Sequence, residues 1–312
     1  MTPSPTRAEV VAAAEASIAR GSKSFAAASR LFDPATRDRA VLLYAWCRRC
    51  DDIADGQDHG HGMTRVDDAP ARVAALSALT ERALDGAVVG DPAFDALRLV
   101  AAETDMPRAW PRDLIAGFAL DAEEWQPESE ADLLRYCYHV AGVVGCMMAV
   151  AMGVSAKDDA VLDRACDLGL AFQLSNIARD LGEDAGVGRC YLPADWLAEF
   201  GVPANDYMAP EHRPALVAMA RRLTDRAAQF EASARMGVRA LSWRSAWAVL
   251  SAAGIYGAIG RSVAARGAGA WDRRVSTSKG AKLGFIAAAA WGATLRARGT
   301  VVPRDAALWR RP

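Results

Sequence analysis

Apolar residues recur at three- and four-residue spacing along most of the chain, which is typical of amphipathic α-helices. No stretch of alternating apolar and polar residues is flanked by hairpin turns, so the pattern offers no strand. The periodicity predicts helices over Glu9–Ala19, Pro34–Ala54, Arg72–Leu84, Ala93–Glu103, Arg112–Ala122, Asp132–Val150, Lys157–Leu181, Pro210–Met236, Ser245–Ala265 and Lys282–Arg296. Loops are predicted over Gly56–Asp68 and Gly182–Arg189. No Pro/Ser-rich linker divides the chain, so we predict one all-α domain over residues 1–312.

The composition fits a packed protein that does not bind nucleic acid. Hydrophobic residues make up 52% and charged residues 24%, which excludes a disordered chain. The 37 basic and 38 acidic residues nearly cancel, so the field of the whole chain attracts neither nucleic acid nor an anionic membrane. Six cysteines are too few for a disulfide scaffold and indicate buried free thiols in a reducing cytoplasm.

One uncharged segment, Tyr136–Ala156, is 21 residues long and therefore long enough to span a membrane. Its hydrophobicity is uneven, because glycines and polar residues interrupt it. The N-terminus also lacks the pattern of a signal peptide. We therefore expect a helix buried inside a cytoplasmic protein. Peripheral contact with a membrane stays open, and no obligatory protein partner is indicated.

A first group of polar residues lies on one face of the helix predicted over Pro34–Ala54. Tyr44, Arg48, Asp51 and Asp55 follow at intervals of three or four residues. Like charges four residues apart destabilise a bare helix, and a bound cation removes the repulsion. Mg²⁺ prefers carboxylate oxygens together with the phosphate oxygens of a substrate. The group is a candidate metal site, with a solvated acidic helix end as the alternative.

A second row of oxygen-bearing side chains lies in a mostly apolar stretch. Its members are Gln173, Asn176, Asp180 and Asp184, each about one turn after the one before. They share one face if the helix runs through Gly182. Buried carboxylates need counter-charges, which a metal ion or the nearby Arg179 and Arg189 would supply. A metal site and an ion-pair network both stay open.

The two acidic helices together are more informative than either alone. Facing helices that project carboxylates inward build metal sites inside helical bundles, and a diphosphate would bridge such ions. The small residues of Val140–Gly153 would leave room for a long hydrocarbon in a central apolar cavity. We expect Gly142, Gly145 and Ala149 to line this cavity, with Gly145 in contact with the substrate. Close helix packing through the glycines is the alternative.

Five sequence motifs are similar to those of the squalene and phytoene synthase family. They are G-S-K-S-F at Gly21–Phe25, Y-A-W-C-R-R-C-D-D-I-A-D at Tyr44–Asp55, Y-C-Y-H-V-A-G-V-V-G at Tyr136–Gly145, Q-L-S-N-I-A-R-D-x-x-E-D at Gln173–Asp184 and G-R-C-Y-L-P at Gly188–Pro193. The motifs occur in the family's order, and the resemblance covers nearly the whole chain.

This resemblance implies an isoprenoid-synthase helical fold and a head-to-head prenyl transfer. The phytoene branch of the family would condense two geranylgeranyl diphosphates through prephytoene diphosphate to phytoene, the first committed step of carotenoid biosynthesis. The resemblance further implies Mg²⁺, with Mn²⁺ as the alternative. No NADPH is expected, since the chain has no dinucleotide-binding fingerprint. A squalene- or dehydrosqualene-type synthase that uses farnesyl diphosphate is the main alternative.

The resemblance also implies roles for individual residues. The expected metal ligands are Asp51, Asp55, Asn176, Asp180 and Asp184. The residues expected in catalysis are Tyr136, near the reacting carbons, with Arg48, Asp51, Asp55, Asp180 and Asp184. The other expected substrate contacts are Ser22, Ser24, Phe25, Tyr44, Gln173, Arg179, Tyr256 and Arg274. Gly182 departs from the pattern, because a larger apolar residue is common at that position.

Two other functions are compatible with some of these features. Head-to-tail prenyl transferases and terpene cyclases also have acidic helices, but the motifs at Tyr136–Gly145 and Gly188–Pro193 argue against them. A non-catalytic relative that acts as an assembly factor would keep the fold. The presence of every expected acidic ligand argues against that function.

Overall fold

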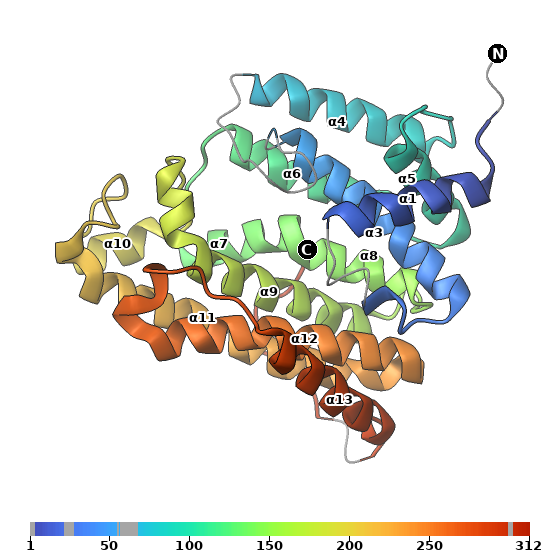
Figure 1. The fold of residues 1–312 in the computed structure, drawn as a ribbon. Coiled ribbons are helices and arrows are strands. Elements are labelled where there is room, and N and C mark those ends of the chain that lie inside the picture. The colour runs from blue at the N-terminus through green and yellow to red at the C-terminus, as the bar shows by residue number, and fades with distance from the viewer. Residues whose placement is uncertain (1–3, 22–27, 55, 57–67, 299–301) are drawn as a thin grey trace. The chain divides into compact units, whose positions relative to one another are not determined.

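The computed structural model describes residues 4–21, 28–54, 56, 68–298 and 302–312. In this part of the chain helix follows helix and no strand occurs, which confirms the all-α class (Figure 1). The chain forms two compact units. Unit 1 comprises Met1–Glu123 and Cys146–Leu162, and unit 2 comprises Glu124–Gly145 and Asp163–Pro312. The single domain over residues 1–312 stays a prediction.

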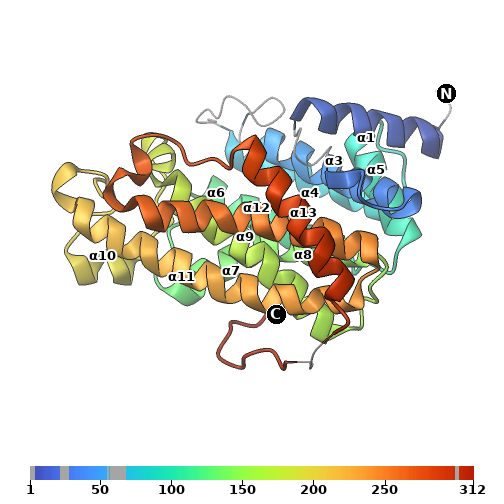
Figure 2. The same ribbon diagram turned by 60° about the horizontal axis from the view of Figure 1, so that its bottom comes forward.

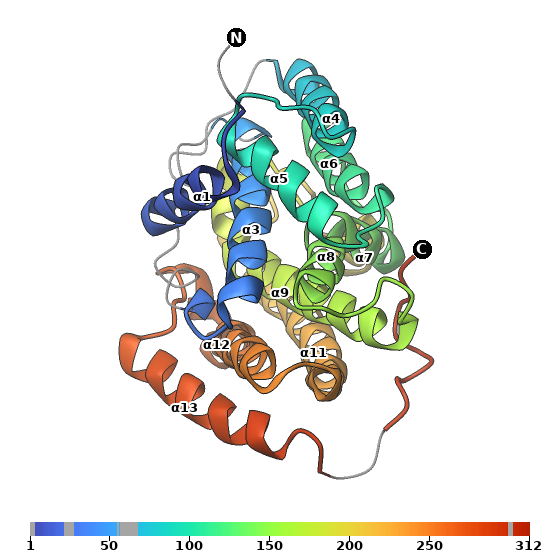
Figure 3. The same cartoon turned by 90° about the vertical axis from the view of Figure 1, so that its right-hand side faces the viewer.

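Unit 1 is built around one central helix, α3. Its helices are α1 (Arg7–Gly21), α3 (Pro34–Ala54), α4 (Ala69–Leu84), α5 (Pro92–Glu103) and α6 (Ala109–Ala122). Helix α3 packs against α1 and α5, and α4 packs against α5 and α6 (Figure 3). The apolar face of α3, which includes Leu42, Leu43 and Trp46, is fully buried. This burial fixes the direction of the opposite face, on which Tyr44, Arg48 and Asp51 lie.

Unit 2 holds long and short helices. Those that lie wholly within it are α7 (Glu130–Cys137), a π-helical turn (Tyr138–Gly142), α10 (Ala194–Phe200), α11 (Arg213–Gly237), α12 (Trp243–Arg266) and α13 (Lys279–Leu295). Helices α8 (Val143–Ala151) and α9 (Asp159–Gly186) each begin in one unit and end in the other. Short 3₁₀ turns occur at Pro210–His212, Val238–Ala240 and Gly267–Trp271. Helix α12 packs between α11 and α13 (Figure 2).

Most of the predicted helices are confirmed, and Pro34–Ala54 is confirmed to the residue. Two predictions were wrong. The predicted loop Gly182–Arg189 is helical up to Gly186, because α9 continues through its internal glycine. The helix predicted over Asp132–Val150 contains a π-helical turn, which the periodicity does not reveal. The short helix α10 was missed, since seven residues are too few for a periodic pattern.

Within the described residues, two helices pass a length and composition test for membrane spans. They are Glu130–Ala151, with a mean hydropathy of 1.4, and Trp243–Trp271, with 1.3. The protein itself buries 61% of the first apolar window and 44% of the second. Core helices of soluble proteins pass the same test, so these two helices are weak support for a membrane span. The burial of the first window agrees with the predicted internal helix.

Glycines let the segment before α9 approach the α9 backbone closely. A Cβ atom on Gly145 would overlap the carbonyl oxygen of Ala165, and one on Gly169 would overlap that of Ala141. A Cβ on Gly142 would lie 2.9 Å from the Sγ of Cys166. The interpretation that Gly142 and Gly145 leave space for a hydrocarbon is therefore wrong. Helix α9 fills that space, and the alternative of close helix packing is correct.

Replacing Gly145 with alanine is expected to lower the free energy of unfolding by about 1–3 kcal/mol, because the added methyl group overpacks this helix crossing. Gly182→Ala is the matched control on α9, since its Cβ would meet the Cε of Met208 at 3.5 Å, an ordinary contact. Alanine there should keep or raise stability, by up to about 1 kcal/mol. Urea denaturation measures both changes, and equal effects of the two variants would contradict the close packing.

Candidate functional site

The first acidic motif, at Tyr44–Asp55, forms the predicted polar stripe on α3, as far as the structure describes it. The guanidinium of Arg48 lies 3.5 Å from the hydroxyl oxygen of Tyr44 and 3.5 Å from a carboxylate oxygen of Asp51. Burial lowers the pKa of Arg48, but the charges of Asp51 and Tyr44 outweigh this effect and the net shift is upward. Tyr44, Arg48 and Asp51 thus lie together on the accessible face of α3.

Four predicted site residues lie outside the described residues. They are Ser22, Ser24 and Phe25 of the G-S-K-S-F motif, and Asp55 at the end of the acidic stripe. Their roles stay predictions.

The second motif lies on one face of α9, as predicted. This helix runs unbroken from Asp159 to Gly186, so the condition that it continue through Gly182 is met. Gln173, Asn176, Asp180 and Asp184 therefore follow one another along the same face. The side-chain oxygen of Asn176 is buried and has no hydrogen-bond partner among the described residues. Such an oxygen is suited to a cation or to a donor from a ligand.

Asp180 is held by two arginines. The Nε of Arg179 donates to its carboxylate at 2.7 Å, and a guanidinium nitrogen of Arg274 lies 3.1 Å from it. Arg274 also pairs with Glu183, one turn further along the helix. Burial lowers the pKa of Arg179, but the hydrogen bond and charge of Asp180 raise it by more. An ion-pair network with arginine, one of the two alternatives that the sequence left open, is therefore present around Asp180, where Arg179 was predicted and Arg274 was not.

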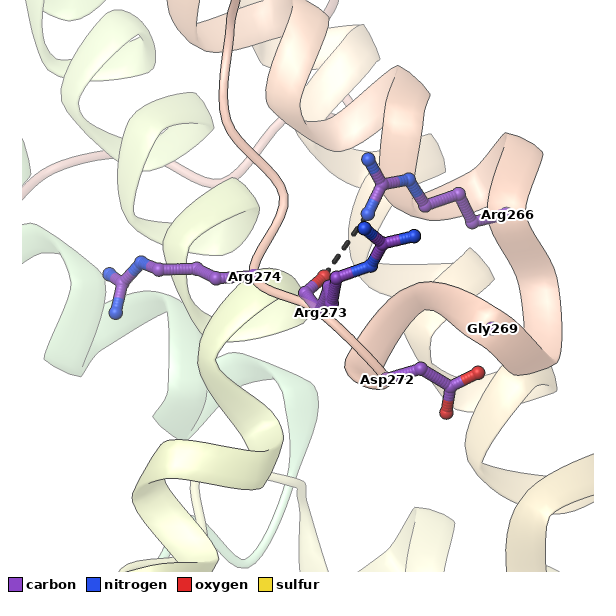
Figure 4. Close-up of a pocket in the computed structure, with 5 residues that line it drawn as sticks. All are labelled: Arg266, Gly269, Asp272, Arg273 and Arg274. Atoms are coloured by element: carbon purple, nitrogen blue, oxygen red, sulfur yellow. Dashed lines mark hydrogen bonds between the residues drawn. The ribbon is translucent and has the colours of Figure 1, made fainter.

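Arg274 reaches this network from a segment with other arginines. Figure 4 shows Arg274 pointing away from Arg266 and Arg273, with which it lines a pocket of about 520 Å³. Arg266 donates to the backbone carbonyl of Arg273 at 3.1 Å, which fixes the start of this segment. The backbone connection after the turn at Gly267–Trp271 thus directs Arg274 to the acidic face of α9.

Tyr256, on α12, contacts α9 at the start of the second motif. Its ring stacks on Phe172 with the ring centres 4.3 Å apart, and Phe172 immediately precedes Gln173. The charge of the Tyr256 phenolate is also one of the smaller causes that raise the pKa of Arg179. The structure therefore brings both late predicted positions, Tyr256 and Arg274, to the second motif.

Tyr136 lies in a stack of three aromatic rings. Its ring centre is 5.7 Å from that of Trp125 and 5.0 Å from that of Tyr191, and the side chain is 3% exposed. The π-helical turn begins two residues later, at Tyr138, and such turns often mark functional sites. Sequence reasoning missed Trp125 and the partnership with Tyr191. The motif G-R-C-Y-L-P contains Tyr191 and was the available signal.

The end of the second motif is fixed by the segment that follows α9. The hydroxyl of Tyr207 lies 2.8 Å from the carbonyl oxygen of Leu181 and 3.1 Å from that of Arg189. Burial, together with the charge of Asp184, raises the pKa of the Cys190 thiol to about 11. The negative charge of Asp184 therefore acts next to a neutral thiol. Tyr207 was also missed, since no motif contains it.

The two acidic motifs belong to different units, so their meeting across a cavity stays a prediction. Among the described residues, which exclude Asp55, no three His, Cys, Asp or Glu side chains are grouped closely enough to hold a metal ion. The oxygen row of α9 includes the amide of Asn176, and it is this mixed set that would bind a hard cation.

The sequence model of the squalene/phytoene synthase family matches residues 18–281 of this chain. The chain belongs to the squalene/phytoene synthase family. The match includes both acidic motifs and the aromatic stack, so the family assignment based on the five motifs is confirmed.

Individual family members are similar over nearly their full length. A protein named phytoene synthase from Pseudescherichia vulneris is 49% identical over 298 residues, covering 95% of this chain and 96% of its own. A 15-cis-phytoene synthase from Paracoccus sp. (strain N81106 / MBIC 01143) is 48% identical over 305 residues, covering 97% and 98%. The crystal structure of a dehydrosqualene synthase in complex with a ligand is 29% identical, with a TM-score of 0.79, and covers 91% of this chain and 96% of its own. The isoprenoid-synthase helical fold is thereby confirmed.

Proposed function

We propose that this protein is a phytoene synthase that joins two molecules of geranylgeranyl diphosphate head to head. The reaction passes through prephytoene diphosphate to phytoene, the first committed step of carotenoid biosynthesis. The observation that carries the proposal is the near-full-length identity of 48–49% to proteins named phytoene synthase. The dehydrosqualene synthase is more distant, at 29%. A squalene-type reaction on farnesyl diphosphate is therefore the second candidate.

The oxygen row of the second motif fits a divalent cation. The buried, unpartnered oxygen of Asn176 lies on the same face of α9 as Asp180 and Asp184, and hard oxygen donors are what Mg²⁺ prefers. Asp51 and Asp55 would hold metal on the first motif. Mg²⁺, with Mn²⁺ as a substitute, would when bound offset the charge of the leaving diphosphate and favour cleavage of its bond to carbon.

In this proposal the arginines of the site also bind the diphosphate of the substrate. Arg179 and Arg274 hold Asp180 in the structure, and both can donate charge-assisted hydrogen bonds to a diphosphate instead. Arg48, which has its own carboxylate partner in Asp51, would do the same on α3. Such exchange keeps every guanidinium paired with an anion before and after the substrate binds, and the carboxylates that it releases would take the cation as their counter-charge.

The aromatic residues would protect the reacting carbons. Trp125 and Tyr191 stack on the ring of Tyr136, and the outer faces of such a stack would stabilise a cation by roughly 0.5–2 kcal/mol each. A dry pocket also keeps water from capturing the cation before it rearranges. The final step is loss of a proton, which needs no reductant, so we propose that NADPH takes no part.

Product analysis tests the proposal. Purified protein is incubated with geranylgeranyl diphosphate and Mg²⁺ without NADPH, and the extracted hydrocarbon is identified. Phytoene is the expected product, and a chelator should prevent its formation. A parallel incubation with farnesyl diphosphate measures the preference for chain length.

Three results would contradict the proposed function. Accumulation of the cyclopropyl diphosphate alone would show that the second half-reaction is missing. A hydrocarbon released only after NADPH is added, or a preference for farnesyl diphosphate, would place the protein with the squalene-type synthases. Full activity in the presence of the chelator would contradict the metal requirement.

A further inference from the structure

Helix α13 presents an apolar face that no described residue of unit 2 covers. Leu283 and Trp291 are the most exposed large apolar residues of the described chain, at 68% and 69%. They lie eight residues apart with the exposed Ala287 midway between them, so all three share one side of the helix. Two large side chains this exposed on one stripe make the face a candidate interaction surface.

The opposite face of α13 is firmly anchored, so the helix itself is held in place. Ala289 and Ala293 are buried, and the indole nitrogen of Trp247 donates to the backbone carbonyl of Ile286 at 2.8 Å. Figure 3 shows α13 lying along the outside of α12, with its other side directed outward. The exposed stripe therefore belongs to a fixed surface of unit 2.

The stretch of sequence that contains α13 is strongly basic. Between Glu231 and Asp305 the sole acidic residue is Asp272. The basic residues of that stretch are Arg235, Arg239, Arg244, Arg261, Arg266, Arg273, Arg274, Lys279, Lys282, Arg296, Arg298 and Arg304. Some of them pair with acids elsewhere, such as Arg261 with Glu231. Lys279, the first residue of α13, and Arg298, three residues after its end, are however exposed.

We propose that the outer face of α13 docks on a lipid bilayer that contains anionic headgroups. An interfacial helix buries an apolar stripe at the boundary between headgroups and acyl chains, while flanking basic residues contact anionic lipids. Trp291 would lie at this boundary, where indole rings are favoured. Trp243, which is 39% exposed and donates to the hydroxyl of Thr294 at 3.1 Å, would extend the aromatic edge.

The charge pattern favours lipid over a second copy of the chain as the occupant. In a symmetric dimer the same patch would face itself, so the basic ends of two α13 helices would meet without an acidic partner. A bilayer with anionic lipids supplies both the apolar layer and the opposite charge. The inference rests on this surface alone and does not depend on the proposed function, although prenyl substrates would partition into the same bilayer.

Vesicle binding tests the inference without any substrate. The full-length protein is sedimented with vesicles made of equal amounts of phosphatidylglycerol and phosphatidylcholine. The variants Leu283→Glu and Trp291→Glu are each expected to lower the bound fraction about tenfold or more, because each removes a large apolar side chain from the interface. Val88→Glu is the matched control, since Val88 is a 39% exposed apolar residue of unit 1 and should leave binding unchanged.

The role of the basic residues is tested separately, by comparing vesicles with and without phosphatidylglycerol. Lys279→Gln and Arg298→Gln should each weaken binding about fivefold, and only to vesicles that contain phosphatidylglycerol. Since all these side chains are exposed, the thermal unfolding of the variants should match that of the wild type. The proposal would be overturned if the glutamate variants bound as well as the wild type, or if the wild type bound pure phosphatidylcholine vesicles as well as the anionic ones. A wild-type dimer in analytical ultracentrifugation that Trp291→Glu makes monomeric would also overturn it.

Discussion

Replacing Asp180 with alanine is expected to lower turnover by about 10²-fold or more while the helices stay folded. The carboxylate is the central member of the oxygen row on α9 and the point where Arg179 and Arg274 converge. Its removal takes away a proposed metal ligand and also the anion that positions both guanidinium groups. Steady-state rates at saturating substrate, measured over a series of Mg²⁺ concentrations, give the size of the effect.

Asp225→Ala is the matched control for this experiment. Asp225 is an exposed carboxylate on α11 whose partner, Arg221, lies one turn away at 3.8 Å. Its loss should change neither rate nor metal dependence, because exposed ion pairs contribute little. If Asp180→Ala keeps a near-wild-type rate and still requires Mg²⁺, Asp180 is not a ligand. A variant that restores its rate at higher Mg²⁺ would instead support a direct role in metal binding.

The sequence predicted the second motif well because its information is local. A row of oxygen donors at one-turn spacing on a helix shares one face wherever the helix packs, and α9 is continuous. The same spacing argument placed Tyr44, Arg48 and Asp51 together on α3. Local spacing cannot show which residues approach from elsewhere. The contact of Arg274 with Asp180 joins positions far apart in the chain and was not predicted, since the family resemblance implied Arg274 only as a substrate contact.

The glycines show why packing was harder to predict than the helices. A small residue at helix spacing either leaves a space or admits another backbone, and the sequence is the same in both cases. At Gly145 the neighbouring backbone of Ala165 decides the matter, and that neighbour follows from the tertiary fold. The near-zero net charge also does not show how charge is distributed, because the basic stretch after Glu231 is balanced by acids elsewhere in the chain.

A buried ion pair holds the C-terminal segment on α9. Asp167 is completely buried, and the guanidinium of Arg304 approaches its carboxylate oxygens at 2.7 and 2.9 Å. The hydroxyl of Ser233 donates to the same carboxylate at 2.5 Å. Beyond Arg304, the ring of Trp309 lies 5.8 Å from that of Tyr138, the first residue of the π-helical turn. The C-terminal segment thus joins α9 to the turn that follows Tyr136.

Asp167→Ala is therefore expected to lower the free energy of unfolding by about 3–5 kcal/mol, because it leaves the partly buried charge of Arg304 without its partner. Replacing both partners, as in Asp167→Leu with Arg304→Met, should cost less than the sum of the single changes, since no unpaired charge remains. Urea denaturation of the wild type, both single variants and the double variant gives this coupling. Asp163→Ala, which breaks the more exposed pair with Arg311, is the control and should cost far less. Additive losses across the cycle would mean that the two side chains act independently, and the C-terminal segment would then be held by its apolar contacts alone.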